Sequence, residues 1–238
     1  MSGTRFSPLM VTLTIGSSYI PPKKPPTLDA LLFGALRLLH PDTENLVDLI
    51  PLRHTDGVFH GSCMMCDPLF PGGQVSFFQS INHERREDTI PEPLFNARLY
   101  SGLGVSVSEL RNGGSQRGTF CPRVDKYPLL HRGSVWKVGF FGCGEASAVE
   151  SLLRYLPGIG RKARRGYGAI VDVDVDAVEV DHSLIRDGLP MRPIPASLWS
   201  QLGGSPQPTC MARARLSMGN PDNHEEPCVA PSGGHLPW

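Results

Sequence analysis

The residues with the clearest potential for chemistry lie in one glycine-rich, basic stretch that ends in an alternating strand, residues 156–176. It contains two glycine pairs and four cations between them: Gly158 and Gly160, Gly166 and Gly168, and Arg161, Lys162, Arg164 and Arg165. Glycine allows a backbone to approach a bulky group closely, and a guanidinium can bind two phosphate oxygens at once. The pattern predicts a site for a polyphosphate backbone, most commonly a nucleic acid. An arginine-rich hairpin exposed to solvent is the alternative interpretation.

Two familiar glycine motifs do not explain this stretch. The dinucleotide-binding fingerprint follows a strand and opens a helix, and here the order is reversed. The Walker motif ends in Gly-Lys-Ser or Gly-Lys-Thr, and neither tripeptide closes the loop. Tyr167, inside the loop, could stack on a base or pack its ring onto the sheet, and both interpretations stay open. The acids Asp172, Asp174 and Asp176 alternate along the next strand, which is typical of a solvated sheet face rather than a metal site.

Two strand–helix–strand units position this loop. In the first, alternation predicts a strand over Phe6–Ile15, and helical spacing predicts a helix from an N-cap at Thr27 to His40. The second unit is predicted as a strand at Ser134–Phe141, a helix over residues 146–156 and a strand at Ala169–Val175. Two such units predict an α+β fold with a ferredoxin-like sheet.

The rest of the chain has shorter elements. The core is expected over residues 5–52 and 134–200, with residues 53–133 as an insertion and residues 201–238 as a Pro/Gly-rich extension. Short strands are predicted at Gln74–Ser80, Leu99–Val107 and Met211–Leu216.

Composition limits the function classes. A net charge of zero and a pI near 7.1 exclude a global positive field, so any binding of nucleic acid must be local. A chain of 238 residues can bury one sizeable core. No apolar run has membrane-spanning length, and polar residues interrupt Met10–Ile20, where a signal peptide would need an apolar segment. We therefore expect a cytoplasmic protein with no membrane partner, whose six cysteines stay reduced.

Three segments resemble the RAMP superfamily of CRISPR-associated proteins. The helix, the sequence Leu-Pro-Gly-Ile-Gly-Arg-Lys-x-x-x-Gly-Tyr-Gly from Leu156 and the following strand resemble its glycine-rich loop. Pro25–Leu36 resembles its first helix, and Gly188–Pro195 resembles the arginine–proline turn of its handle-binding subunits. Within the superfamily, the chain is most similar to the Cas-family-five-like subunit of type IV effector complexes, over roughly residues 5–50 and 134–199.

This resemblance implies one RRM-like domain over residues 1–238, in which residues 53–133 form a thumb-like insertion. It implies a non-catalytic subunit without a cofactor, which binds the 5′ handle of the crRNA and helps to recognise target DNA. Backbone and large CRISPR subunits would be its protein partners. The expected nucleic-acid-binding residues are Lys23, Lys24, Gly158, Gly160, Arg161, Lys162, Arg164, Arg165, Gly166, Tyr167 and Arg192.

A crRNA-processing endoribonuclease of the same superfamily is the first alternative. Metal-independent RNA cleavage needs a general base and a general acid, which are commonly histidines. Four histidines lie near predicted element ends, namely His40, His54, His131 and His182, but no motif pairs them. We therefore expect no catalytic residue and no RNA cleavage.

A zinc-stabilised structural or interaction protein is the alternative of another class. His60, Cys63 and Cys66 have the spacing of zinc ligands, and Cys121 or Cys143 could complete the set. A structural zinc site usually has two Cys-x-x-Cys knuckles, and the chain has one half-motif. We therefore predict no metal.

Overall fold

The computed structural model describes residues 6–22, 24–43, 45–78, 107–110, 117–120, 124–215 and 224–231. The chain divides into two compact units. The first comprises Met1–Gly72 and Leu129–Trp238, and the second comprises Gly73–Pro128. The second unit lies within the segment predicted as an insertion, residues 53–133.

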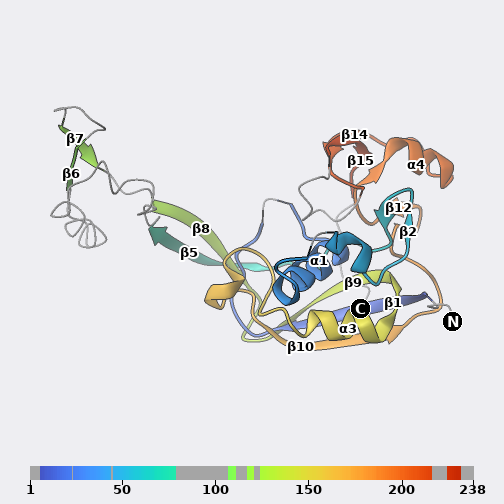
Figure 1. The fold of residues 1–238 in the computed structure, drawn as a ribbon, viewed down its shortest axis with the longest axis horizontal. Coiled ribbons are helices and arrows are strands. Elements are labelled where there is room, and N and C mark those ends of the chain that lie inside the picture. Colours follow the sequence, from blue (N-terminus) through green and yellow to red (C-terminus); the bar gives the residue numbers. More distant parts are fainter. Residues whose placement is uncertain are drawn as a thin grey trace. The chain divides into compact units, whose positions relative to one another are not determined.

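The first unit is built on a four-stranded antiparallel sheet with the order β10-β1-β9-β4, of which β10, β1 and β9 are labelled in Figure 1. Its strands are β1 (Ser7–Ile15), β4 (Met65–Cys66), β9 (Trp136–Gly144) and β10 (Ile170–Ala177). β1 lies in the middle and pairs antiparallel with both β9 and β10. With its helices, the unit confirms the predicted α+β class.

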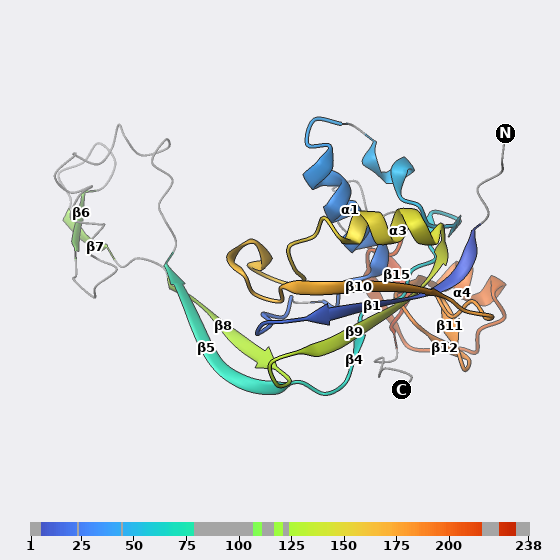
Figure 2. The same ribbon diagram turned by 90° about the horizontal axis from the view of Figure 1, so that it is seen from below.

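Two helices cover one face of this sheet, α1 (Leu28–Leu39) and α3 (Ala146–Leu153) (Figure 2). The alternation of β1 turns Leu9, Val11 and Leu13 towards them, and these side chains are completely buried. α1 begins after Thr27 as predicted. α3 ends three residues earlier than predicted, because Pro157 disfavours a helical conformation in the residue before it.

The opposite face of the sheet is polar over most of β10. Strand register places Thr12 beside Asp174 and Thr14 beside Asp172, and all three acids predicted to share a face are exposed. Their alternation confirms the predicted solvated face. The β9 end of this face is covered by a small apolar cluster of Met10, Met65, Phe141 and Met191.

β10 is an edge strand whose backbone is partly blocked by side chains. Asp172 Oδ1 accepts a hydrogen bond from the Val173 N–H at 2.9 Å, and Arg154 Nη2 donates to the Val173 carbonyl at 3.0 Å. The backbone N–H and carbonyl of Val173, which point away from β1, therefore both have hydrogen-bond partners. This hinders the pairing of another strand with β10. A register shift between Thr14 and Ile15 ends the regular alternation, and Val171 is 60% exposed.

Smaller elements complete the first unit. β2 (His54–Thr55) and β3 (Val58–Phe59) form a hairpin whose turn residues, Asp56 and Gly57, both have positive φ. A second two-stranded pair is formed by β11 (Ile185–Arg186) and β12 (Leu189–Pro190). The remaining elements are η1 (Leu46–Leu49), β13 (Ile194–Pro195), α4 (Ala196–Gln201), β14 (Thr209–Ala212) and β15 (Glu226–Val229).

β13, β15 and β14 form a three-stranded sheet in that order. The strand predicted at Met211–Leu216 overlaps β14 only at Met211 and Ala212, because β14 begins two residues earlier and ends four residues earlier. β15 had no clear signal in the sequence, because Pro227 interrupts its pattern.

The second unit contains the hairpin of β6 (Val107–Leu110) and β7 (Arg117–Phe120). The ladder of β5 (Phe70–Phe78) and β8 (Val124–His131) spans the boundary between the units. The predicted strand Gln74–Ser80 falls mainly within β5, whereas most of the predicted Leu99–Val107 lies outside the described residues. In the described part of the chain, no helix combines the length and the apolar character that crossing a membrane requires.

Candidate nucleic-acid interface

The glycine-rich loop between α3 and β10 is tied to the segment that joins β1 to α1. The Arg161 N–H donates to the Ile20 carbonyl at 2.9 Å, and the Gly168 N–H donates to the Ser18 carbonyl at 2.7 Å. Ser17 Oγ donates to the Gly166 carbonyl at 2.8 Å and accepts from the Ala169 N–H at 2.9 Å. These long-range bonds hold the loop in one conformation.

Two of the loop glycines are required by packing against Tyr19. Gly160 has φ +81°, and a Cβ there would lie 2.6 Å from the Ile20 carbonyl oxygen and would collide with the Tyr19 ring. At Gly168, with φ +61°, a Cβ would collide with the Ile159 carbonyl oxygen and would lie 3.2 Å from Tyr19 Cδ2. Tyr19 is itself buried, and burial raises the pKa of its phenol. Packing within the protein is therefore sufficient to require glycine at both positions.

The four cations lie on the outer part of the same loop. Arg164 and Arg165 are exposed, and Arg161 and Lys162 are half-buried. A short 3₁₀ turn, η3 (Ala163–Arg165), groups them closely, and it begins and ends in left-handed backbone at Lys162 and Gly166. The loop therefore presents a compact basic surface, here called the basic loop (residues 158–168).

The other predicted binding residues near the loop have different environments. Lys24 is exposed, and its Nζ lies 3.9 Å from Glu225 Oε1. It is four residues from Ile20, which bonds to the loop, so it can add to the same basic surface. Tyr167 is half-buried. Lys23 lies outside the described residues.

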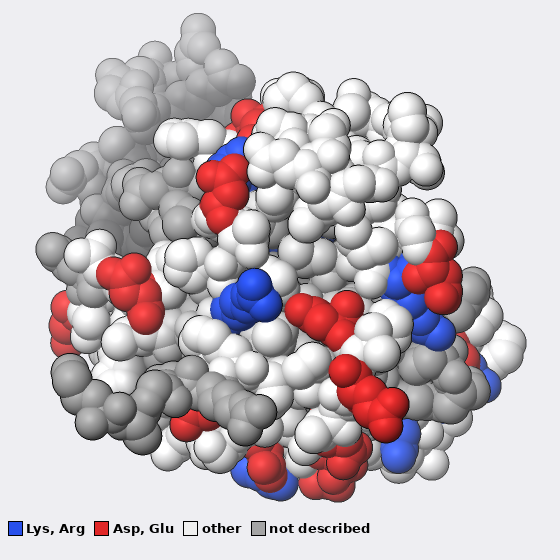
Figure 3. Space-filling view, turned by 90° about the vertical axis from the view of Figure 1, so that its right-hand side faces the viewer, with Lys and Arg blue, Asp and Glu red and all other residues white. Residues whose placement is uncertain are grey.

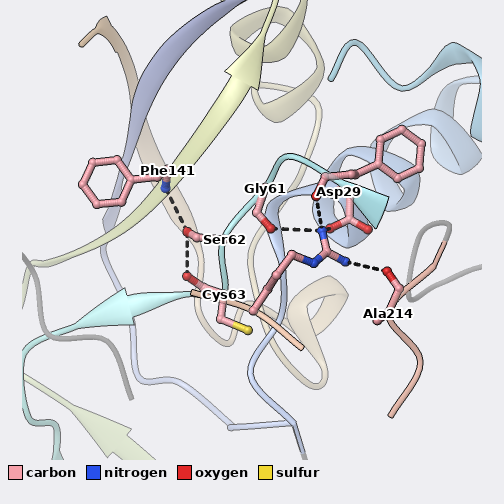
Figure 4. A network of polar contacts seen from close by, with 8 residues as sticks. Asp29, Gly61, Ser62, Cys63, Phe141 and Ala214 are labelled. Carbon is pink, nitrogen blue, oxygen red and sulfur yellow. Dashed lines mark hydrogen bonds and ion pairs between the residues drawn. The ribbon is translucent and has the colours of Figure 1, made fainter. Parts of the chain in front are cut away.

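Arg192 lies inside the protein, which contradicts the prediction that it binds nucleic acid. Its side chain is completely buried, and Nη1 donates to Asp29 Oδ1 at 3.0 Å (Figure 4). Nη1 also donates to the Phe59 carbonyl at 2.6 Å and to the Gly61 carbonyl at 3.1 Å, and Nη2 donates to the Ala214 carbonyl at 3.2 Å. The guanidinium thus joins α1, the segment after β3 and the segment after β14.

The half-motif of zinc ligands is not assembled into a site. Cys63 lies beside Arg192 and Asp29, and burial raises the pKa of its thiol to about 12. Cys66 lies near Asp67 and Arg132, while His60 bonds elsewhere. Over the described ranges, no group of three or more His, Cys, Asp or Glu side chains is placed to hold a metal ion.

His60 is instead the centre of a hydrogen-bonded chain that the sequence did not reveal. Its Nδ1 donates to Asp181 Oδ2 at 3.1 Å, and its Nε2 lies 2.8 Å from Thr55 Oγ1. Because 121 residues separate His60 from Asp181, no spacing rule could have paired them. Burial by itself would raise the pKa of Asp181, but hydrogen bonds from His60 and from the Ser183 backbone outweigh it and lower this pKa to about 2.

The four histidines considered as general bases lie on different elements. His40 follows α1, His54 lies on β2 with its ring edge-on to Phe59, and His131 ends β8. His182 packs edge-on against Phe141, with ring centroids 5.1 Å apart. The hydrogen-bonded arrangement typical of a general base occurs at His60 and not at these four.

This arrangement predicts acid sensitivity that depends on Asp181. A carboxylate whose pKa is lowered by folding stabilises the fold fully above about pH 4, and this contribution is lost as the pH falls through about 2. Because the carboxylate is partly exposed, the contribution is about 1 kcal/mol after allowance for solvent screening. Urea denaturation of the wild type and of Asp181→Asn from pH 7 to pH 2 should show a difference in free energy of unfolding that shrinks below pH 4. Cys143 also lies near Asp181, and a difference that stays constant across this range would show that the charge of Asp181 is not the source of the stabilisation.

Acidic side chains are present on other surfaces of the first unit. On the face drawn in Figure 3, acidic side chains lie among the basic ones, and no continuous basic patch covers the coloured surface. The open sheet face carries the acids of β10, which would repel a phosphate backbone.

No protein-family model matches the chain. No curated protein is significantly similar to it.

Proposed function

We propose that this protein is a non-catalytic RNA-binding subunit of a CRISPR ribonucleoprotein complex, and that its basic loop holds the backbone of the crRNA 5′ handle. The observation that carries this proposal is the loop itself. Four cations stand close together on a segment held by hydrogen bonds to residues 16–20, in a chain with no net charge. A held loop loses little conformational entropy when it binds, so its charges are well suited to phosphates.

The topology of the main sheet supports the RAMP assignment within this proposal. In chain order its strands are β1, β4, β9 and β10, with α1 after β1 and α3 between β9 and β10. The spatial order β10-β1-β9-β4 then corresponds to 4-1-3-2, the order of a ferredoxin-like sheet. In this proposal the second unit is the thumb-like region, the protein acts in the cytoplasm, and backbone subunits, a large subunit and target DNA are its partners.

The acidic sheet face indicates how RNA would bind. In RRM-like domains, aromatic side chains on the sheet commonly stack on the bases. Here Asp172, Asp174 and Asp176 occupy the exposed part of that face. We therefore propose that the RNA follows the basic loop and the neighbouring segment with Lys24, and not the open sheet.

Replacing Arg161, Lys162, Arg164 and Arg165 together by Ala should weaken the binding of single-stranded RNA. If each cation neutralises one phosphate, the slope of log K against log[salt] should fall by about 3, and the affinity at low salt should fall by about 100-fold. Fluorescence anisotropy with labelled repeat RNA from the host's own CRISPR array, across a salt series, measures both quantities.

A matched pair of double variants separates the loop from net charge. Arg164→Ala/Arg165→Ala and Arg37→Ala/Arg213→Ala each remove two exposed positive charges, but only the first changes the basic loop. Arg164→Ala/Arg165→Ala should lower the affinity for RNA much more than the control, Arg37→Ala/Arg213→Ala. Equal losses would show that binding is non-specific, and no loss in the quadruple variant would refute the proposed interface.

Processing of crRNA remains a second candidate function because of one observation, the chain of Thr55, His60 and Asp181. A histidine oriented by a carboxylate is the usual arrangement of a general base. His60 is only 8% exposed, however, which favours a structural role. Incubation with repeat RNA in EDTA decides the matter: specific cleavage that His60→Ala abolishes would replace the binding subunit by the endoribonuclease.

A further inference from the structure

Two cysteines face each other across the ladder of β14 and β15. Cys210 on β14 is the direct antiparallel partner of Cys228 on β15. Opposed residues in an antiparallel ladder direct their side chains to the same face. Their Cα atoms are about 4.5–5.5 Å apart in such pairs, which lies inside the range of about 4.4–6.8 Å for disulfides. The backbone therefore places both thiols where a bond between them can form.

The two thiols differ in access to solvent. Cys210 is exposed, whereas Cys228 is completely buried. The Cys228 thiol is directed towards β14, because its Sγ donates to the Ala212 carbonyl at 3.6 Å. Burial, together with the nearby negative charge of Glu226, raises the pKa of Cys228 to about 11. An exposed thiol beside a buried one is the arrangement of an attacking cysteine and a resolving cysteine.

We propose that Cys210 and Cys228 are a redox modification site, at which Cys210 reacts first with a small disulfide such as oxidised glutathione and Cys228 then closes a reversible disulfide. This site is separate from the basic loop and does not depend on the proposed RNA-binding function.

The reaction proceeds in two exchanges. The Cys210 thiolate, having lost its proton to water, attacks one sulfur of oxidised glutathione, whose S–S bond breaks and releases one glutathione thiolate. The Cys228 thiol then loses its proton, and its sulfur attacks Cys210 Sγ and displaces the second glutathione thiolate. Both released thiolates take up protons. In balance, two protein thiols are oxidised to one disulfide and one glutathione disulfide is reduced to two thiols.

A disulfide between Cys210 and Cys228 would close a loop whose residues bind side chains in the protein interior. The chain between the two cysteines supplies the Ala214 carbonyl to the buried Arg192 and carries Arg215. Arg215 forms ion pairs with Asp56 at 2.5 Å and with Glu226 at 3.0 Å, so this segment also contacts the turn between β2 and β3. Closing the disulfide would restrict this segment in the unfolded chain and so stabilise the fold.

The site can be tested on the full chain with oxidised glutathione as the probe. Non-reducing peptide mapping by mass spectrometry should give a cross-linked peptide that joins Cys210 to Cys228, and dithiothreitol should remove it. In the Cys228→Ser variant, the reaction should stop after the first exchange, with a glutathione adduct on Cys210. Cys210→Ser should lower modification of Cys228 by at least about tenfold, because the buried thiol is largely protonated and shielded. Cys143→Ser, a buried thiol on β9, serves as the control and should behave as the wild type.

Thermal unfolding gives a second readout. Oxidation should raise the Tm of the wild type by about 5 °C, reversibly, and should not raise that of Cys210→Ser. The proposal is overturned if the wild type accumulates only the glutathione adduct, or if Cys210 is cross-linked to a different cysteine. It is equally overturned if Cys228 reacts as fast in Cys210→Ser as in the wild type.

Discussion

Replacing Arg192 by methionine is expected to lower the free energy of unfolding by about 3–5 kcal/mol, because the change leaves a buried carboxylate at Asp29 without its ion-pair partner. It also removes the donor to the carbonyls of Phe59, Gly61 and Ala214, which join three segments of the first unit. Methionine fills much of the space of arginine, so the loss reports the polar contacts more than a cavity. Urea denaturation followed by circular dichroism measures the change.

Two further variants separate the ion pair from general damage. Arg213→Met replaces an exposed arginine of the same unit and should change the free energy of unfolding by less than about 0.5 kcal/mol. The double variant Arg192→Met/Asp29→Leu also removes the buried carboxylate of Asp29. Its loss of free energy of unfolding should therefore be smaller than the sum of the losses in the two single variants. An additive double variant, or a stable Arg192→Met, would show that the pair is not a structural centre.

The second large effect is expected at Gly160. Gly160→Ala should destabilise the protein by about 3 kcal/mol, because the new Cβ meets Tyr19 and the Ile20 carbonyl and because φ is +81°. Tyr19 packs edge-on against Trp136, with ring centroids 5.8 Å apart, so it has little room to move. Thermal unfolding monitored by tryptophan fluorescence measures the loss of stability, and its signal includes Trp136, which contacts Tyr19.

Other glycines of the chain provide graded controls. Gly166 has φ +89° but no heavy atom within 4 Å of an added Cβ, so Gly166→Ala should cost only about 1 kcal/mol of backbone strain. Gly34 lies inside α1 with its nearest neighbour 4.0 Å away, and Gly34→Ala should stabilise the protein by up to about 1 kcal/mol. Equal effects at Gly160 and Gly166 would refute the packing explanation.

The outcome of the glycine analysis shows where sequence reasoning succeeds and where it stops. The spacing of Gly158, Gly160, Gly166 and Gly168 indicates special backbone, and three of the four do have positive φ. Spacing does not give the reason for this backbone, because a glycine required by a neighbouring tyrosine, as at Gly160, has the same spacing as one required by a phosphate. Tyr19 and Gly160 are far apart in the sequence, and only the folded chain brings them together.

Local sequence patterns were sufficient to predict the α+β class, the approximate positions of β1, α1, β9, α3 and β10, and the grouping of four cations in one loop. These features depend on local alternation, capping residues and proline, so neighbours in the chain are sufficient to specify them. The tertiary structure alone decided that Arg192 is buried against Asp29, that His60 bonds to Asp181, and that Cys210 faces Cys228. Each of these pairs depends on strand register and on the packing of distant segments, because burial and partners of a polar side chain are properties of the assembled core and not of its sequence neighbours.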